Sequence, residues 1–322
     1  MLEDGFWRIR HFEKIASNAL APSFTPVALH TTLLEGMNYY PQMSPWDTFG
    51  EQFNADTLSQ DFRIIKDLRF NSVRIFVGYE DFGKAQVSQS KLTKLKELLD
   101  EAQKADLNVI ITLFDFYGDY RLQDWTLTNA HLRQIVTAVK DHPALLAWDL
   151  KNEPDLDFEN RGERAVLSWL SQSIHYLKSI DSKHPLTIGW SSPEKAILLE
   201  EKVDIVSYHY YRDLEDLGAA HSKLTKATLK PVVLQEFGMS TYRGLWNPFG
   251  YSPKDQKAYY QEFFAIQKQH NLSFFSWTLY DYEEIPTSVA GRYPWRRNKQ
   301  KQFGIISQEN ELKPVYPIIK NR

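Results

Sequence analysis

The feature of this sequence that most constrains its fold is an alternation between two kinds of segment. The first kind is a short, near-continuous apolar run, which is typical of strands buried on both faces of a parallel sheet. The second kind carries apolar residues three and four positions apart, as at Leu58, Phe62 and Ile65, which indicates a helix with one buried face. The strand-like runs occupy residues 33–40, 72–79, 108–116, 145–152, 185–190, 204–211, 231–237 and 274–282.

Eight such alternations within 322 residues match a (β/α)8 barrel, which typically needs ~250 residues. An open doubly wound sheet is the competing fold, but no glycine-rich phosphate turn follows an early strand. Residues 191–202 leave room for only a short helix. We therefore predict an α/β fold, a (β/α)8 TIM barrel over residues 31–322, preceded by an N-terminal extension at residues 1–30.

Composition excludes several classes of protein and site. The chain has 38 Lys and Arg against 41 Asp and Glu, which does not suggest a nucleic-acid partner. It has no cysteine, which excludes disulfides and thiol catalysis. No apolar run is long enough to span a membrane, and the first residues do not form a signal peptide. A cytoplasmic protein and a secreted or surface protein whose leader has been removed both stay open, and we expect a monomer.

Polar and aromatic residues cluster where the predicted strands end. In barrels of this kind the active site lies at the carboxyl ends of the strands. Glu153 and Glu236 end the fourth and seventh runs, so they should face each other across the mouth of the barrel. Two opposed carboxylates are what glycoside hydrolysis requires. The other candidates at strand ends are Tyr39, Trp46, Arg74, Asp115, Asn152, His209, Tyr211 and Trp277.

These motifs resemble glycoside hydrolase family 5, within the clan of retaining (β/α)8 glycosidases, over about residues 33–318. The matching stretches are Ser-Val-Arg-Ile at 72–75, Trp-Asp-Leu-Lys-Asn-Glu-Pro at 148–154, Ser-Tyr-His-Tyr-Tyr at 207–211, Gln-Glu-Phe-Gly at 235–238, and Trp277. The resemblance implies a cellulase-like enzyme that cleaves a β-linked glycan, such as a β-glucan or β-mannan, without a metal or cofactor.

The resemblance also implies roles for the two glutamates. Glu153 corresponds to the general acid/base and Glu236 to the nucleophile. Strand periodicity predicts that Val232, Leu234 and Glu236 share one face. Arg74 is the one charge inside its apolar run, so we expect it to pair with Glu236. The pKa of Glu153 should then be the higher of the two, because a cation stabilises the charge on Glu236.

The remaining residues are expected to bind substrate. By the resemblance, Asn152 holds the sugar 2-hydroxyl, His209 lines the catalytic sugar site, and Tyr211 bonds the nucleophile. Trp277 forms the floor beneath the sugar. Asp115 stands where many cellulases of the family have a histidine, which argues against classical cellulase activity. Aromatic residues that could line the cleft or its outer subsites are Tyr39, Trp46, Trp190, Trp246 and Trp295.

Several alternatives remain open at this stage. The basic stretch at residues 292–301 could contact an acidic glycan or form a solvated loop. The same site could transfer a glycosyl group to another sugar instead of water. A carbohydrate-binding barrel without activity would lack one carboxylate, and a metal-dependent hydrolase would need histidine and aspartate at several strand ends. Both descriptions suit this sequence less well than a glycosidase, and a catalytically weak carbohydrate-binding barrel is kept as an alternative.

Overall fold

The structure, a computed structural model, describes residues 33–245 and 247–322. Its parallel strands close into a barrel in the order β1 to β8, and β1 pairs with both β2 and β8. The strands are β1 (Glu35–Asn38), β2 (Ser72–Gly78), β3 (Asn108–Asp115), β4 (Leu145–Asn152), β5 (Leu186–Trp190), β6 (Val206–Tyr210), β7 (Val232–Phe237) and β8 (Ser273–Ser276). The predicted TIM barrel is confirmed, whereas the extension at residues 1–30 and Trp246 lie outside the described residues.

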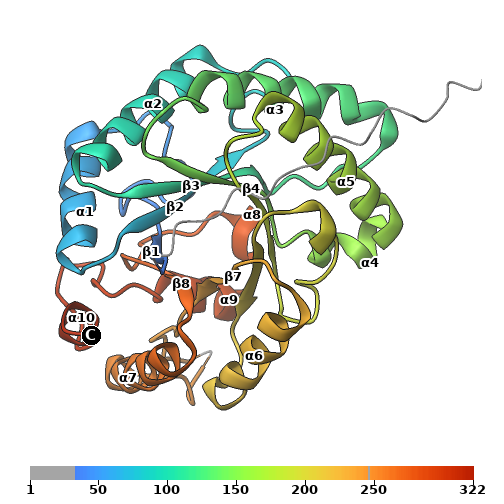
Figure 1. Cartoon of the computed structure of the whole chain (residues 1–322). Coiled ribbons are helices and arrows are strands. Elements are labelled where there is room, and N and C mark those ends of the chain that lie inside the picture. Colours follow the sequence, from blue (N-terminus) through green and yellow to red (C-terminus); the bar gives the residue numbers. More distant parts are fainter. Residues whose placement is uncertain (1–32, 246) are drawn as a thin grey trace, which may run out of the picture.

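Helices surround this barrel, and α8 and α9 lie inside their ring in the view of Figure 1. The α-helices of the described residues are α1 (Ala55–Asp67), α2 (Gln89–Lys104), α3 (Trp125–Val139), α4 (Phe158–Arg161), α5 (Glu163–Ile180), α6 (Leu217–Ala227), α7 (Pro253–His270), α8 (Thr287–Ala290), α9 (Pro294–Lys301) and α10 (Tyr316–Lys320). The connection from β5 to β6 has only the 3-10 turn η3 (Glu200–Lys202), as its length predicts. Among the described residues, no helix is long and apolar enough to cross a membrane.

Local sequence signals set where the longer helices begin. Asn54 caps α1 by accepting a hydrogen bond from the Thr57 backbone N–H at 3.1 Å. At the start of α7, Ser252 and Asp255 cap each other's backbone N–H groups, and Pro253 occupies the first turn. Both devices satisfy N–H groups that a helix start otherwise leaves without partners.

The interior of the barrel is divided into an apolar and a polar part. A small apolar cluster, separate from the large core between sheet and helices, contains Leu34, Ile110, Ala147, Ile205, Val233 and Phe275. Further along the strands the buried residues are polar, including Arg74, Thr112, Asp149 and His209. The polar side chains inside the barrel therefore lie toward the carboxyl ends of the strands.

The register of β7 differs from the expectation. Val233, not Val232 or Leu234, belongs to the inner cluster. The pairing of β7 shifts on both sides, between Tyr208 and His209 of β6 and between Leu234 and Phe237 towards β8. This irregularity brings Glu236 inward even though Leu234 packs outward. The prediction that Val232, Leu234 and Glu236 share a face is wrong, because strict alternation does not survive such a shift.

Gly36 makes room for the ring that fills the inner cluster. A Cβ atom at Gly36 would lie 2.3 Å from two ring atoms of the fully buried Phe275. We expect Gly36→Ala to lower the free energy of unfolding by about 1–3 kcal/mol through overpacking. Urea denaturation measures this loss, and Phe275→Leu added to Gly36→Ala should recover part of it. Gly118→Ala is the control, since its nearest neighbour would be 3.9 Å away; an equal loss there would contradict the explanation.

Candidate active site

A buried arginine organises the mouth of the barrel. The Arg74 guanidinium contacts Asp149 Oδ2 at 2.8 Å and Glu236 Oε2 at 3.1 Å. It also donates to Asn38 Oδ1 at 3.0 Å, Thr112 Oγ1 at 3.0 Å and Asn152 Oδ1 at 2.7 Å. Desolvation opposes the charge on Arg74, but the carboxylates of Asp149 and Glu236 raise its pKa above the ordinary value. The expected pairing of Arg74 with Glu236 is present.

Glu236 is held from two sides. Arg74 contacts one carboxylate oxygen, and the Tyr211 hydroxyl donates to the other at 2.6 Å. Although 44% of Tyr211 is exposed, desolvation of its phenol, together with the charge of Glu236, raises the pKa of Tyr211 well above its ordinary value. Tyr211 therefore stays a hydrogen-bond donor, and both oxygens of Glu236 keep a fixed orientation.

Glu153 faces Glu236 across the site. It follows β4 with a positive φ of 44° and precedes Pro154, which begins the turn η2 (Pro154–Asp157). His209 Nδ1 lies 2.9 Å from Glu153 Oε1 and 3.7 Å from Glu236 Oε2. One carboxylate oxygen of Glu153, one of Glu236 and a His209 ring nitrogen all lie within 4.8 Å of one another.

The surroundings of Glu153 act on its pKa in opposite directions. Desolvation raises the pKa of Glu153, but the hydrogen bond and charge of His209, followed by the charge of Arg74, lower it overall. The resting site therefore favours a charged Glu153 paired with His209.

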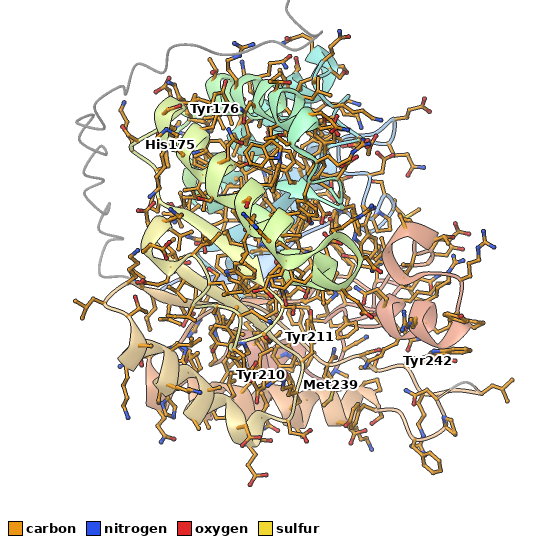
Figure 2. The ribbon with its side chains drawn as sticks, turned by 90° about the vertical axis from the view of Figure 1, so that its right-hand side faces the viewer. His175, Tyr176, Tyr210, Tyr211, Met239 and Tyr242 are labelled. Carbon is orange, nitrogen blue, oxygen red and sulfur yellow. The ribbon has the colours of Figure 1, made fainter. Side chains whose placement is uncertain are left out.

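An aromatic cleft of about 400 Å³ contains both glutamates. Trp46 and Trp277 line it with ring centroids 6.0 Å apart, and Tyr40 stacks on Phe76 at 4.9 Å. A second cavity of about 470 Å³ adjoins this cleft and shares Tyr211, Lys299 and Phe303 with it. Figure 2 shows Tyr211 beside Met239, another residue of that second cavity. Stacked rings with a few convergent polar groups form a surface suited to the apolar faces of sugars.

Asp115 lines the cleft as a buried carboxyl group. Tyr40 donates its hydroxyl to Asp115 Oδ2 at 2.9 Å. Burial raises the pKa of Asp115 to about 6, although the Tyr40 hydrogen bond and the charge of Lys151 oppose this change. Asp115 can therefore exchange a proton near neutral pH and hydrogen-bond a hydroxyl group in either state.

The cleft brings together most of the residues singled out by sequence: Trp46, Asp115, Asn152, Glu153, Tyr211, Glu236 and Trp277, with Arg74 and His209 in contact beneath them. Tyr39 is an exception, because it packs outward and donates to Asp61 of α1 at 2.7 Å. Trp190 is only 1% exposed and packs against Phe158, so it is no sugar platform. Trp295 stays exposed and stacks on Tyr293.

Sequence reasoning missed several residues of the site. Tyr40, not its neighbour Tyr39, lines the cleft, and Phe76, Phe116 and Phe303 contribute further rings. The sequence did contain a signal that could have identified Asp149, which forms an ion pair with Arg74. It is an acidic residue inside an apolar run, which is costly to bury without a partner, as was argued for Arg74.

Among the described residues, Glu153, His209 and Glu236 form the one group of three whose atoms could hold a metal ion. Each of these side chains already has a partner at this point: Arg74 and Tyr211 for Glu236, and His209 for Glu153. The arrangement is that of two carboxylates oriented by hydrogen bonds in the wall of one cleft.

Arg74→Met tests how strongly this network stabilises the fold. Removing the cation leaves Asp149, whose side chain is fully buried, without its ionic partner. We expect the free energy of unfolding to fall by about 3–5 kcal/mol, as for other broken buried ion pairs. Chemical denaturation is the measurement, with Arg133→Met on the exposed face of α3 as control. Comparable losses in both variants would contradict the special role of Arg74.

Asp115→Asn tests the raised pKa of this carboxyl group. An acid with a higher pKa in the folded state loses stability as pH rises from its unfolded pKa, near 4, through about 6. Asparagine cannot ionise, and it can still accept the Tyr40 hydrogen bond. The variant should therefore gain stability relative to wild type between pH 4 and 6, by up to about 3 kcal/mol, with a plateau above. Urea denaturation across pH 4–8 checks this, with Asp141→Asn at an exposed turn as the control.

Comparisons with known proteins agree with this geometry. A model of cellulases of glycosyl hydrolase family 5 matches residues 31–283. A β-glucuronidase from Chlorocebus aethiops is 24% identical over 305 residues, covering 86% of this chain and 42% of that protein. Mannan endo-1,4-β-mannosidase 1 from Oryza sativa subsp. japonica is 26% identical over 238 residues, covering 52% and 54%. The chain thus spans about half the length of these relatives.

Two solved structures have the same fold. Exo-β-1,4-mannosidase Op5Man5 from Opitutaceae bacterium strain TAV5 superposes with a TM-score of 0.71 at 19% identity, covering 90% of this chain and 58% of that one. A GH2 β-galacturonidase from Eisenbergiella tayi gives 0.67 at 18% identity, covering 90% and 50%. The family model matches well over half of the sequence, and the chain therefore belongs to glycosyl hydrolase family 5.

Proposed function

We propose that this chain is a retaining glycoside hydrolase that cleaves β-linked glycosides by double displacement. Glu236 is the nucleophile, and Glu153 is the general acid and base. The observation that carries the proposal is that oxygens of the two carboxylates lie within 4.8 Å. Retaining enzymes have carboxyl groups about 5–5.5 Å apart, whereas inverting enzymes need about 6.5–9.5 Å to admit a water molecule.

In the first step, Glu236 attacks the anomeric carbon while the bond to the leaving oxygen breaks. Glu153 gives its proton to that oxygen, and a covalent glycosyl–Glu236 intermediate forms. In the second step, Glu153 takes a proton from water, the water oxygen bonds to the anomeric carbon, and Glu236 is released. Retention of configuration follows from two inversions at one carbon.

The hydrogen bonds of the site suit these steps. Arg74 and Tyr211 each bind one oxygen of Glu236 and hold this carboxylate in the wall of the cleft. The contact of 2.9 Å with His209 orients the Glu153 carboxyl group, which lines the cleft and gives its proton to the leaving oxygen. Asn152 accepts from Arg74, which leaves its amide N–H groups as donors for a sugar hydroxyl.

The substrate class is a β-glucan, a β-mannan or a related β-linked glycan. The relatives and structural neighbours act on different sugars by their names, including mannosides, glucuronides and galacturonides. Transfer to a second sugar would proceed through the same covalent intermediate, and it is recognised by longer products in place of free sugar.

Replacing each of the two glutamates by glutamine should affect activity in a different way. Glu153→Gln should lower kcat/KM by about 10²–10⁴-fold on glycosides with poor leaving groups, because their oxygen needs a proton. On a dinitrophenyl glycoside, whose leaving group departs unprotonated, the loss should be much smaller. Glu236→Gln should remove activity on both. Steady-state kinetics measure these losses, with the exposed Glu80→Gln as control.

The stereochemical outcome is decided by NMR of the first-formed product from a panel of aryl β-glycosides and soluble β-glycans. A first-formed β-anomer supports double displacement, whereas an α-anomer would overturn it. Wild-type turnover by Glu236→Gln would refute the assignment of the nucleophile.

A further inference from the structure

A basic face of α9 borders the cleft that holds the two glutamates. Arg296, Lys299 and Gln300 line this cleft, and their spacing of three and four places them on one side of the helix. Between Pro294 and Lys301 the helix has four basic residues and no acidic one. The molecule as a whole carries −3, so this local excess of positive charge is not a general property of its surface.

The helix is anchored to two loops, so its backbone keeps a defined place at the cleft. Ser240 donates to the Lys299 carbonyl at 2.6 Å, and Asn298 donates to the Tyr242 hydroxyl at 3.2 Å. On the side away from the cleft, Arg297 donates to the Ile285 carbonyl at 2.9 Å. In Figure 1, α9 lies within the ring of outer helices, which agrees with its position at the mouth of the barrel.

The acids of the cleft do not account for these cations. Glu236 is paired with Arg74, Glu153 with His209, and Asp115 with the Tyr40 hydroxyl. Within residues 33–245 and 247–322, neither Arg296 nor Lys299 forms an ion pair; the Arg296 guanidinium lies 5.9 Å from the centre of the Tyr293 ring. Two cations directed at a substrate cleft are therefore available to an anionic group on the substrate.

We propose that the glycan cleaved here carries a carboxylate, as a uronic acid does, and that Arg296 and Lys299 bind it. This inference rests on the proposed function and narrows its substrate class. A guanidinium and a carboxylate form paired, charge-assisted hydrogen bonds, and an ammonium adds a point charge. Lys299 also lines the adjoining cavity, but four acidic residues line it too, namely Asp213, Glu215, Asp255 and Glu262. We therefore expect the carboxylate on the cleft side, where Arg296 lies.

The test compares substrates that differ only in a carboxylate. One arm uses 4-nitrophenyl β-D-glucuronide, galacturonide and mannuronide beside the matching glucoside, galactoside and mannoside. The other arm uses β-linked disaccharides with a uronic acid or its neutral counterpart as the leaving sugar. We expect kcat/KM of wild type to favour the acid in at least one pair by about fivefold or more, with the preference falling as NaCl is added.

Variants of α9 show whether the two cations cause the preference. Arg296→Gln and Lys299→Gln should each lower this preference by about two- to fivefold, the effect expected of an exposed charge pair. Lys301→Gln is the matched control, because it removes the same charge from the same helix but does not line the cleft. An equal effect of Lys301→Gln would assign the preference to general attraction and overturn the proposal.

The outcomes separate this inference from the function on which it rests. Hydrolysis of neutral glycosides with retention but without an acid preference in either arm overturns the inference alone. Absence of hydrolysis in every pair, including the neutral ones, counts against the proposed function itself.

Discussion

The site depends on one buried interaction, the bond between the Arg74 guanidinium and its carboxylate partners. A buried cation is tolerated only when it is fully paired, and Arg74 meets this condition with side chains from β1, β3, β4 and β7. The same contacts hold Glu236 and Asn152 in place. Pairing Arg74 therefore orients the groups that perform the proposed chemistry, so stability and function share one network.

Around this network, the two ends of the barrel interior differ in polarity. Its inner apolar cluster fills one end of the interior. The opposite end is polar, and its pKa values are set by burial against nearby partners: Asp115 is raised to about 6, and Glu153 is lowered by His209. Loops and short helices beyond the strands then shape the cleft, with rings from several segments and the basic residues of α9.

Much of this could be predicted from sequence, and the failures have physical reasons. The carboxyl ends of parallel strands meet at one end of a barrel, so Glu153 and Glu236 had to approach each other. Tyr39 and Tyr40 could not be separated, because two adjacent aromatic residues at a strand end fit either face. We expected Glu236 to face inward because side chains alternate along a strand. In the structure, Glu236 faces inward because the register of β7 shifts, and an apolar sequence pattern does not reveal such a shift.

The sequence by itself determined the barrel, the order of its strands and the residue types at their ends. These follow from local periodicity and from the rule that buried charges need partners. Only the tertiary structure decided that Arg74 also pairs with Asp149, how His209 lowers the pKa of Glu153, and that α9 returns to the cleft. Those properties depend on distances between residues far apart in the chain, because desolvation and Coulomb interactions act through space.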